Sequence, residues 1–183
     1  SDVYRGQLVA GAKSFYQLKA APEKQKFRHQ WGKTIKMFSK VVDRYPKSNE
    51  AYRAEFTIGK LYEGLNAVSK NSKDLDRAAQ HYNNVSEKYS SANLSDDALF
   101  RVAEIHLLKR RFAQASTTFE KIFKKYPQGD QAIIARQKFK NIKVTPKNKV
   151  YTKVSTVLKT KLPKPVAIAK QDLPLKKASS NST

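Results

Sequence analysis

The chain has 183 residues, and its 37 Lys and Arg against 15 Asp and Glu give a formal net charge of +22, which favours anionic partners. It contains no cysteine, so disulfides, thiolate zinc sites and cysteine nucleophiles are excluded. No apolar run approaches the roughly 20 residues that cross a bilayer, and no basic-then-apolar targeting segment opens the sequence.

Apolar residues return every three or four positions almost without interruption up to Val144, which predicts helices. Period-two alternation is absent, so we expect an all-α domain. The apolar stripes run over 4–18, 27–45, 51–65, 75–89, 99–106, 112–126 and 132–142. Short loops between these seven helices predict antiparallel hairpins. Ser48 and Ser95 precede acidic residues and are the expected N-caps, while Pro46 and Pro127 end the helices before them.

The hairpins repeat along the chain. Tyr45-Pro46 and Tyr126-Pro127 close two helices of the same pattern. Residues 96–129 resemble the tetratricopeptide pattern of about 34 residues, because small and aromatic residues stand at its spacing. These are Ala103, Ala115, Phe119 and Pro127. We therefore expect residues 1–143 to form a tetratricopeptide-like right-handed superhelix of about three antiparallel helix hairpins plus a capping helix.

Composition changes after residue 143. The stretch 144–183 is rich in Lys, Pro and Ser, and Asp172 is its one acidic residue. Such a composition cannot bury a core, and it predicts a disordered, basic, flexible linker.

Several segments of the predicted helical region resemble one bacterial family. They are Phe15-Tyr16-x-Leu18, Phe27-Arg28-His29-x-Trp31, Arg44-Tyr45-Pro46-Lys47-Ser48, Gly59-Lys60-Leu61-Tyr62, Asp74-Leu75-Asp76-x-Ala78 and Ser95-Asp96-Asp97-Ala98. They look like the helical-repeat region at the N-terminus of periplasmic N-acetylmuramoyl-L-alanine amidases, which cleave the cell wall. More loosely, the chain is similar to tetratricopeptide modules of outer-membrane assembly lipoproteins.

This resemblance implies a periplasmic or cell-envelope location. It also implies that a zinc hydrolase domain follows residue 183 in the full-length protein, and that the repeat region positions this domain on peptidoglycan. A free-standing periplasmic scaffold for envelope assembly or division is the alternative. A basic nucleic-acid-binding helical protein is a further one.

The residues themselves predict no catalytic, metal or cofactor site in this chain. His29, His81 and His106 fall on three different predicted helices, without the spacing of zinc ligands. The paired carboxylates lie at helix starts, where capping explains them better than acid-base chemistry. They are Asp74, Asp76, Asp96 and Asp97. Any zinc is therefore expected only in the downstream domain.

Two sets of residues are candidates for binding. The inner helices of a repeat stack line a concave groove that accepts a partner segment. The predicted groove residues are Glu55, Lys60, Glu63, Arg101, Glu104 and Lys109. A basic patch for an anionic polymer is predicted at Lys24, Lys26, Arg28, Lys33 and Lys36.

The expected partners are a protein or peptide in the groove and peptidoglycan or another anionic envelope polymer on the patch. Nucleic acid is the weaker alternative, because the aromatic residues lie on core stripes and do not alternate with the basic residues as a stacking surface requires. We expect a monomer.

Overall fold

The computed structural model describes residues 2–143 and 151–152. The helices are α1 (Asp2–Lys19), α2 (Pro22–Gln25), α3 (Arg28–Arg44), α4 (Asn49–Ser69), α5 (Ser72–Lys88), α6 (Ser95–Leu108), α7 (Phe112–Lys125) and α8 (Gln131–Asn141). The expected all-α fold is confirmed. Within the described ranges there is one helix more than predicted, because Pro22, whose fixed φ suits a first helical position, starts the four-residue α2.

The expected linker over 144–183 lies outside the described residues, apart from two positions. The backbone of β2 (Tyr151–Thr152) pairs antiparallel with β1 (Ile142–Lys143), which follows α8 directly. The predicted disorder of this linker therefore stays a prediction.

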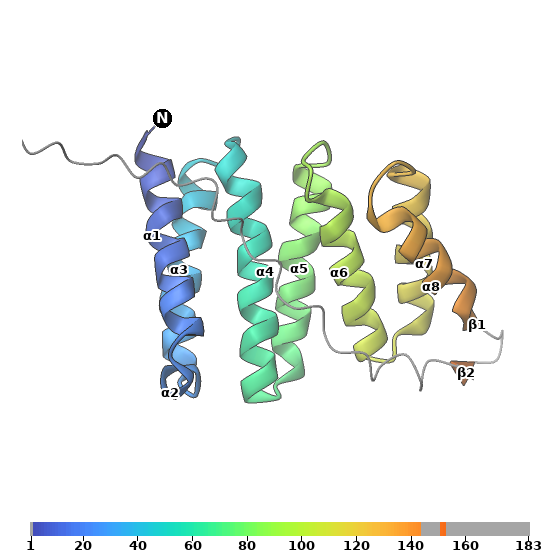
Figure 1. Ribbon diagram of the computed structural model, residues 1–183, viewed down its shortest axis with the longest axis horizontal. Coiled ribbons are helices and arrows are strands. Elements are labelled where there is room, and N and C mark those ends of the chain that lie inside the picture. The colour runs from blue at the N-terminus through green and yellow to red at the C-terminus, as the bar shows by residue number, and fades with distance from the viewer. Residues whose placement is uncertain (1, 144–150, 153–183) are drawn as a thin grey trace, which may run out of the picture. The chain divides into compact units, whose positions relative to one another are not determined.

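Consecutive helices pack as hairpins: α1 with α3, α4 with α5, and α6 with α7, while α8 packs on α7. Neighbouring hairpins are joined by contacts of α3 with α4 and of α5 with α6. Figure 1 shows α1, α4 and α6 in chain order, each beside the second helix of its own hairpin. We call α1, α4, α6 and α8 the first helices, and α3, α5 and α7 the second helices.

Each second helix inserts one large aromatic side chain into the core. Phe38 of α3, Tyr82 of α5 and Phe119 of α7 are all at most 2% exposed. They occupy equivalent positions, three residues before Val41, Val85 and Ile122, each fully buried. The repeated pattern thus supplies one apolar cluster per hairpin, as the sequence predicts.

Of the two predicted N-caps, one is correct. The Ser48 Oγ accepts a hydrogen bond from the Ala51 amide at 3.1 Å, and α4 begins at the next residue. Ser95 is instead the first residue of α6 and follows the N-cap Leu94. Its hydroxyl donates a hydrogen bond to the carbonyl of Tyr89, the residue after α5, at 2.7 Å.

The paired helices α4 and α5 pack closely at Gly59. A Cβ added there would lie 2.7 Å from the Tyr82 ring, which is fully buried and cannot move into solvent. Gly59→Ala is therefore expected to lower the free energy of unfolding by about 1–3 kcal/mol through overpacking. Urea unfolding measures this.

Gly32 is the matched control for Gly59, since it also lies inside a helix but a Cβ there would meet nothing within 4 Å. Gly32→Ala should raise the stability by about 0.5–1 kcal/mol through helix propensity. Equal effects at the two glycines would mean that α4 and α5 do not approach as closely as the structure shows.

Candidate functional site

The first helices contact one another through charged side chains. The Glu63 carboxylate of α4 accepts two hydrogen bonds from Arg101 of α6, at 2.5 Å from Nη2 and 3.2 Å from Nε. The Glu104 carboxylate of α6 accepts one from Lys138 Nζ of α8 at 2.8 Å, and it lies 3.5 Å from Arg101 Nη1. We call Lys60, Glu63, Arg101, Glu104 and Lys138 the charged row.

Glu63 is also held from the second helices. The Tyr82 hydroxyl donates to its Oε2 at 2.6 Å. Burial disfavours the Arg101 guanidinium, but the charge and hydrogen bonds of Glu63 outweigh this and raise the pKa of Arg101. Burial and the Glu63 carboxylate together raise the pKa of the Tyr82 hydroxyl well above its ordinary value. This part of the charged row is fixed before any partner arrives.

An apolar row runs beside the charged row. Phe56, Phe100 and Ile134 each precede a member of the charged row by four residues, and so lie on the same helix face. The Lys138 Nζ lies 5.7 Å from the centroid of the Phe100 ring, so the two rows touch. Phe56 and Phe100 are half-buried, whereas Ile134 is 43% exposed.

The apolar row extends into α1 at Leu8, which is half-buried. Gly11 of α1 faces the ring of Phe38, just as Gly59 of α4 faces the ring of Tyr82. Leu8 lies three residues before Gly11 and Phe56 lies three residues before Gly59, so Leu8 and Phe56 occupy equivalent positions. We call the two rows together the first-helix face.

Lys60 differs from the other members of the charged row. Its side chain is half-buried, and among the described residues no carboxylate lies within ion-pair distance of its ammonium group, which is 5.8 Å from the Phe15 ring centroid. Burial lowers the pKa of Lys60, and the charge of Arg101 lowers it further, against the opposing effect of Glu63.

Two of the six predicted groove residues lie elsewhere. Glu55 is 2% exposed, and its carboxylate accepts from Asn84 at 3.2 Å and lies 2.6 Å from His81 Nδ1. Lys109 follows the end of α6, where it donates to Asp76 and to the Ser72 carbonyl of α5. Both predictions were wrong because these side chains turn toward a second helix, which spacing along one helix does not reveal.

One of the five residues of the predicted basic patch is paired with a carboxylate. Lys24, Lys26, Lys33 and Lys36 are exposed and form no ion pair with a described residue. Arg28 instead binds the buried Asp74 of α5 through two hydrogen bonds, at 2.8 and 2.5 Å. Unlike the four lysines, its guanidinium is paired with a carboxylate and joins α3 to α5.

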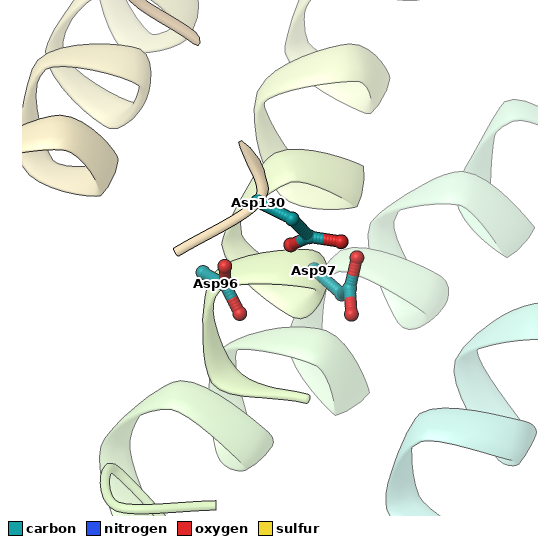
Figure 2. A group of neighbouring side chains, drawn as sticks. All are labelled: Asp96, Asp97 and Asp130. Carbon is teal, nitrogen blue, oxygen red and sulfur yellow. The ribbon is translucent and has the colours of Figure 1, made fainter. Parts of the chain in front are cut away.

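Three carboxylates meet where α6 and α8 begin. Asp96 and Asp97 lie in the first turn of α6, and Asp130 immediately precedes α8; Figure 2 shows the carboxylates of Asp97 and Asp130 turned toward one another. One oxygen from each lies within 4.8 Å of the others. The group is not evident in the sequence because Asp130 is far along the chain from Asp96 and Asp97, although it repeats the position of Asp96 one repeat later.

Carboxylate oxygens are the ligands that Ca²⁺ and Mg²⁺ prefer, so this acidic group is the one in the described part of the chain that could hold a cation. It borders an open hollow of about 550 Å³ between the two loops that precede α6 and α8. Carboxylates near helix starts also occur without an ion, and no further feature of the hollow points to a metal.

Burial and neighbouring carboxylates raise the pKa of Asp96 and of Asp97. Burial is the main cause for Asp97, followed by the charges of Asp130 and Asp96, and together they raise the pKa of Asp97 to about 6. Burial, followed by Asp130, raises that of Asp96. In the folded state Asp97 keeps its proton up to about pH 6, whereas the unfolded chain releases it near pH 4. The contribution of this proton to the free energy of unfolding is therefore present below about pH 4 and is lost as the pH rises through about 6.

Asp97→Asn should therefore stabilise the protein at pH 7. The Asn oxygen can still accept the hydrogen bond that Gln131 donates to Asp97 at 2.9 Å. We expect a gain of about 1 kcal/mol, reduced by solvent screening from the full value of the pKa shift, and no gain near pH 4. Urea unfolding at both pH values checks this, with exposed Asp43→Asn as control. A loss of stability at pH 7 would contradict the assigned repulsion.

The comparisons with known proteins address the repeat directly. Residues 97–129 match the family model described as tetratricopeptide repeat. This segment is similar to a tetratricopeptide repeat. It comprises α6 and α7 almost entirely, so the hairpin that carries Arg101, Glu104 and Phe119 is the repeat unit, and its equivalents in α1–α3 and α4–α5 form a tetratricopeptide-like helical region.

No curated protein and no solved structure was found to match the chain. None of the helices described is long and apolar enough to cross a membrane.

Proposed function

We propose that this chain is a protein-interaction scaffold that binds an extended segment of a partner protein across its first-helix face. The similarity to a tetratricopeptide repeat supports a role in protein binding, because such repeats typically bind protein partners. The observation that carries the proposal is the apolar row of Phe56, Phe100 and Ile134 beside charged side chains that are already held in place. A rigid face of this kind binds a segment without first having to order its own side chains.

Exposed apolar residues on the first helices make this testable. Leu108 and Ile134 are 52% and 43% exposed, so their replacement by arginine should leave the fold intact. A displayed random-peptide library panned against the full chain should yield enriched peptides, and the double variant Leu108→Arg, Ile134→Arg should lose them. Phe27→Arg is the control, since Phe27 is 55% exposed and precedes a second helix. Failure to enrich any peptide, or equal enrichment by the double variant, would contradict the proposal.

A more specific form of the proposal places this scaffold in a cell-wall N-acetylmuramoyl-L-alanine amidase, in the periplasm or cell envelope. Here the repeat region would position a downstream zinc hydrolase domain on peptidoglycan. Its support is the resemblance of the segments around Trp31, Pro46, Gly59 and Asp96, together with the exposed lysines of α2 and α3. A free-standing scaffold is the alternative within the same class.

The envelope context predicts binding to purified peptidoglycan sacculi that weakens steeply between roughly 50 and 300 mM salt, since exposed charges are screened. Reversal of the four free lysines of the patch to glutamate should weaken it further. These are Lys24, Lys26, Lys33 and Lys36. The control reverses four exposed lysines of other helices, which changes the net charge equally. They are Lys73, Lys88, Lys121 and Lys140.

Equal effects of the two lysine sets would mean that net charge, not this patch, determines binding. Tighter binding of duplex DNA than of sacculi at equal salt would favour the nucleic-acid alternative. Circular dichroism should show unchanged helix content in both variants.

A further inference from the structure

Charges alternate in sign along the charged row, but they do not cancel. Glu63 is satisfied by Arg101 and Tyr82, and Glu104 is satisfied by Lys138 and Arg101. Lys60 is left without a counter-charge from any described residue. The row therefore carries one unmatched positive charge, at a defined position on α4.

The surroundings of Lys60 leave its ammonium group poorly compensated. Arg101 and Lys19 both act on its ammonium group with like charge, and Glu63, the nearby carboxylate, is already engaged by Arg101. The Phe15 ring offers a weak cation-π contact at 5.8 Å. A half-buried ammonium group with so little compensation gains considerably when a carboxylate reaches it.

We propose that Lys60 binds an acidic side chain of the partner segment, and that the residues flanking this acid in the segment are apolar and pack against Phe15 and Phe56. This inference rests on the proposed function and specifies the chemistry of its partner. Phe15 lies on the α1 side of Lys60, and Phe56 lies one turn before it on α4. An apolar residue on each side of the acid therefore finds an aromatic surface.

The same face disfavours other anionic groups. A polyanion that continued along the row past Lys60 would meet Arg101 and Lys138 already paired with Glu63 and Glu104, so it would find no further free positive charge there. The apolar row also continues on both sides of Lys60, to Leu8 in one direction and to Phe100 and Ile134 in the other. A segment that covers this row extends past Lys60 both ways, so the acid is an internal side chain and not a chain terminus.

Parallel panning of one displayed random-peptide library tests this with the full chain. Native protein should enrich peptides in which a single Asp or Glu stands between apolar residues. Lys60→Gln should enrich peptides without the acid, because the aromatic surfaces remain. Lys121→Gln, which removes an exposed lysine from a second helix, should enrich the same peptides as native protein.

Affinity measurements make the pairing specific. One synthetic peptide from the native pool and its Asp→Asn or Glu→Gln analogue are titrated against native protein and Lys60→Gln by fluorescence anisotropy. We expect roughly tenfold weaker binding for either single change, and little further loss when both are combined, as residues in direct contact require.

The outcomes separate the two proposals. Enriched peptides that lack an acid, or an acidic motif retained by Lys60→Gln, overturn the assignment of Lys60 and leave the scaffold function standing. Independent, additive losses in the four titrations also overturn it. If native protein enriches no peptide at all, the proposed function itself fails.

Discussion

Phe119→Ala is expected to lower the free energy of unfolding by about 3–5 kcal/mol. The Phe119 side chain is fully buried in the cluster that joins α6, α7 and α8, and its ring meets that of Phe100 edge to face at a centroid distance of 5.6 Å. Removal of the ring leaves a cavity between three helices that the surrounding backbone cannot close. Thermal and urea unfolding measure the loss.

Phe27→Ala is the matched control for Phe119, since its side chain is 55% exposed. It should change the stability by no more than about 0.5 kcal/mol. A loss below about 1 kcal/mol at Phe119 would show that its ring does not fill the space between the hairpins.

Asp74→Ala is expected to cost about 2–4 kcal/mol. The carboxylate is fully buried and accepts hydrogen bonds from Arg28, from Arg77 at 3.2 Å and from Ser69 at 3.1 Å. The two guanidinium groups are about half exposed and can turn to water, which keeps the cost below that of a wholly buried pair. Urea unfolding at pH 7 gives the value.

The same carboxylate predicts a dependence on pH. The hydrogen bonds from Arg28 lower the pKa of Asp74 against the opposing effect of burial. Its contribution to stability is therefore complete above the unfolded value near pH 4 and is lost as the pH falls through the lowered pKa. The stability difference between native protein and Asp74→Asn should shrink below pH 4. A difference that stays constant down to pH 2 would show that the interaction does not depend on the charge.

The repeat could be predicted because each second helix carries its own complete signal. An aromatic residue, a branched residue three positions later and a closing tyrosine recur in α3, α5 and α7, as in the run from Phe119 through Ile122 to Tyr126. Local capping was less predictable: Ser48 and Ser95 look alike in sequence, but the Ser48 hydroxyl accepts from the Ala51 amide, whereas the Ser95 hydroxyl donates to the carbonyl of Tyr89.

The candidate site could be predicted only where one helix face decides the outcome. Spacing along α4 predicts that Lys60 and Glu63 share one face of that helix, but it does not reveal that Glu55 on the same helix turns to His81. The pairing of Arg28 could not be predicted either, because its partner Asp74 lies 46 residues away on another helix. Pairing across helices depends on the packed structure and is not contained in the periodicity of one segment.

Two ion pairs of this structure each connect helices that are separated by one other helix. Arg28 and Asp74 connect α3 to α5 past α4, and Glu63 and Arg101 connect α4 to α6 past α5. Both pairs join neighbouring hairpins. Stacked repeats interact only with their nearest neighbours, and where this coupling is weak the terminal units can fray while the centre stays folded. Ion pairs between alternate helices strengthen this coupling, because α4 cannot detach without breaking its contacts with α5 and its ion pair with α6. The stack should thus melt as one cooperative unit, and hydrogen exchange in α4, α5 and α6 should report a single opening free energy.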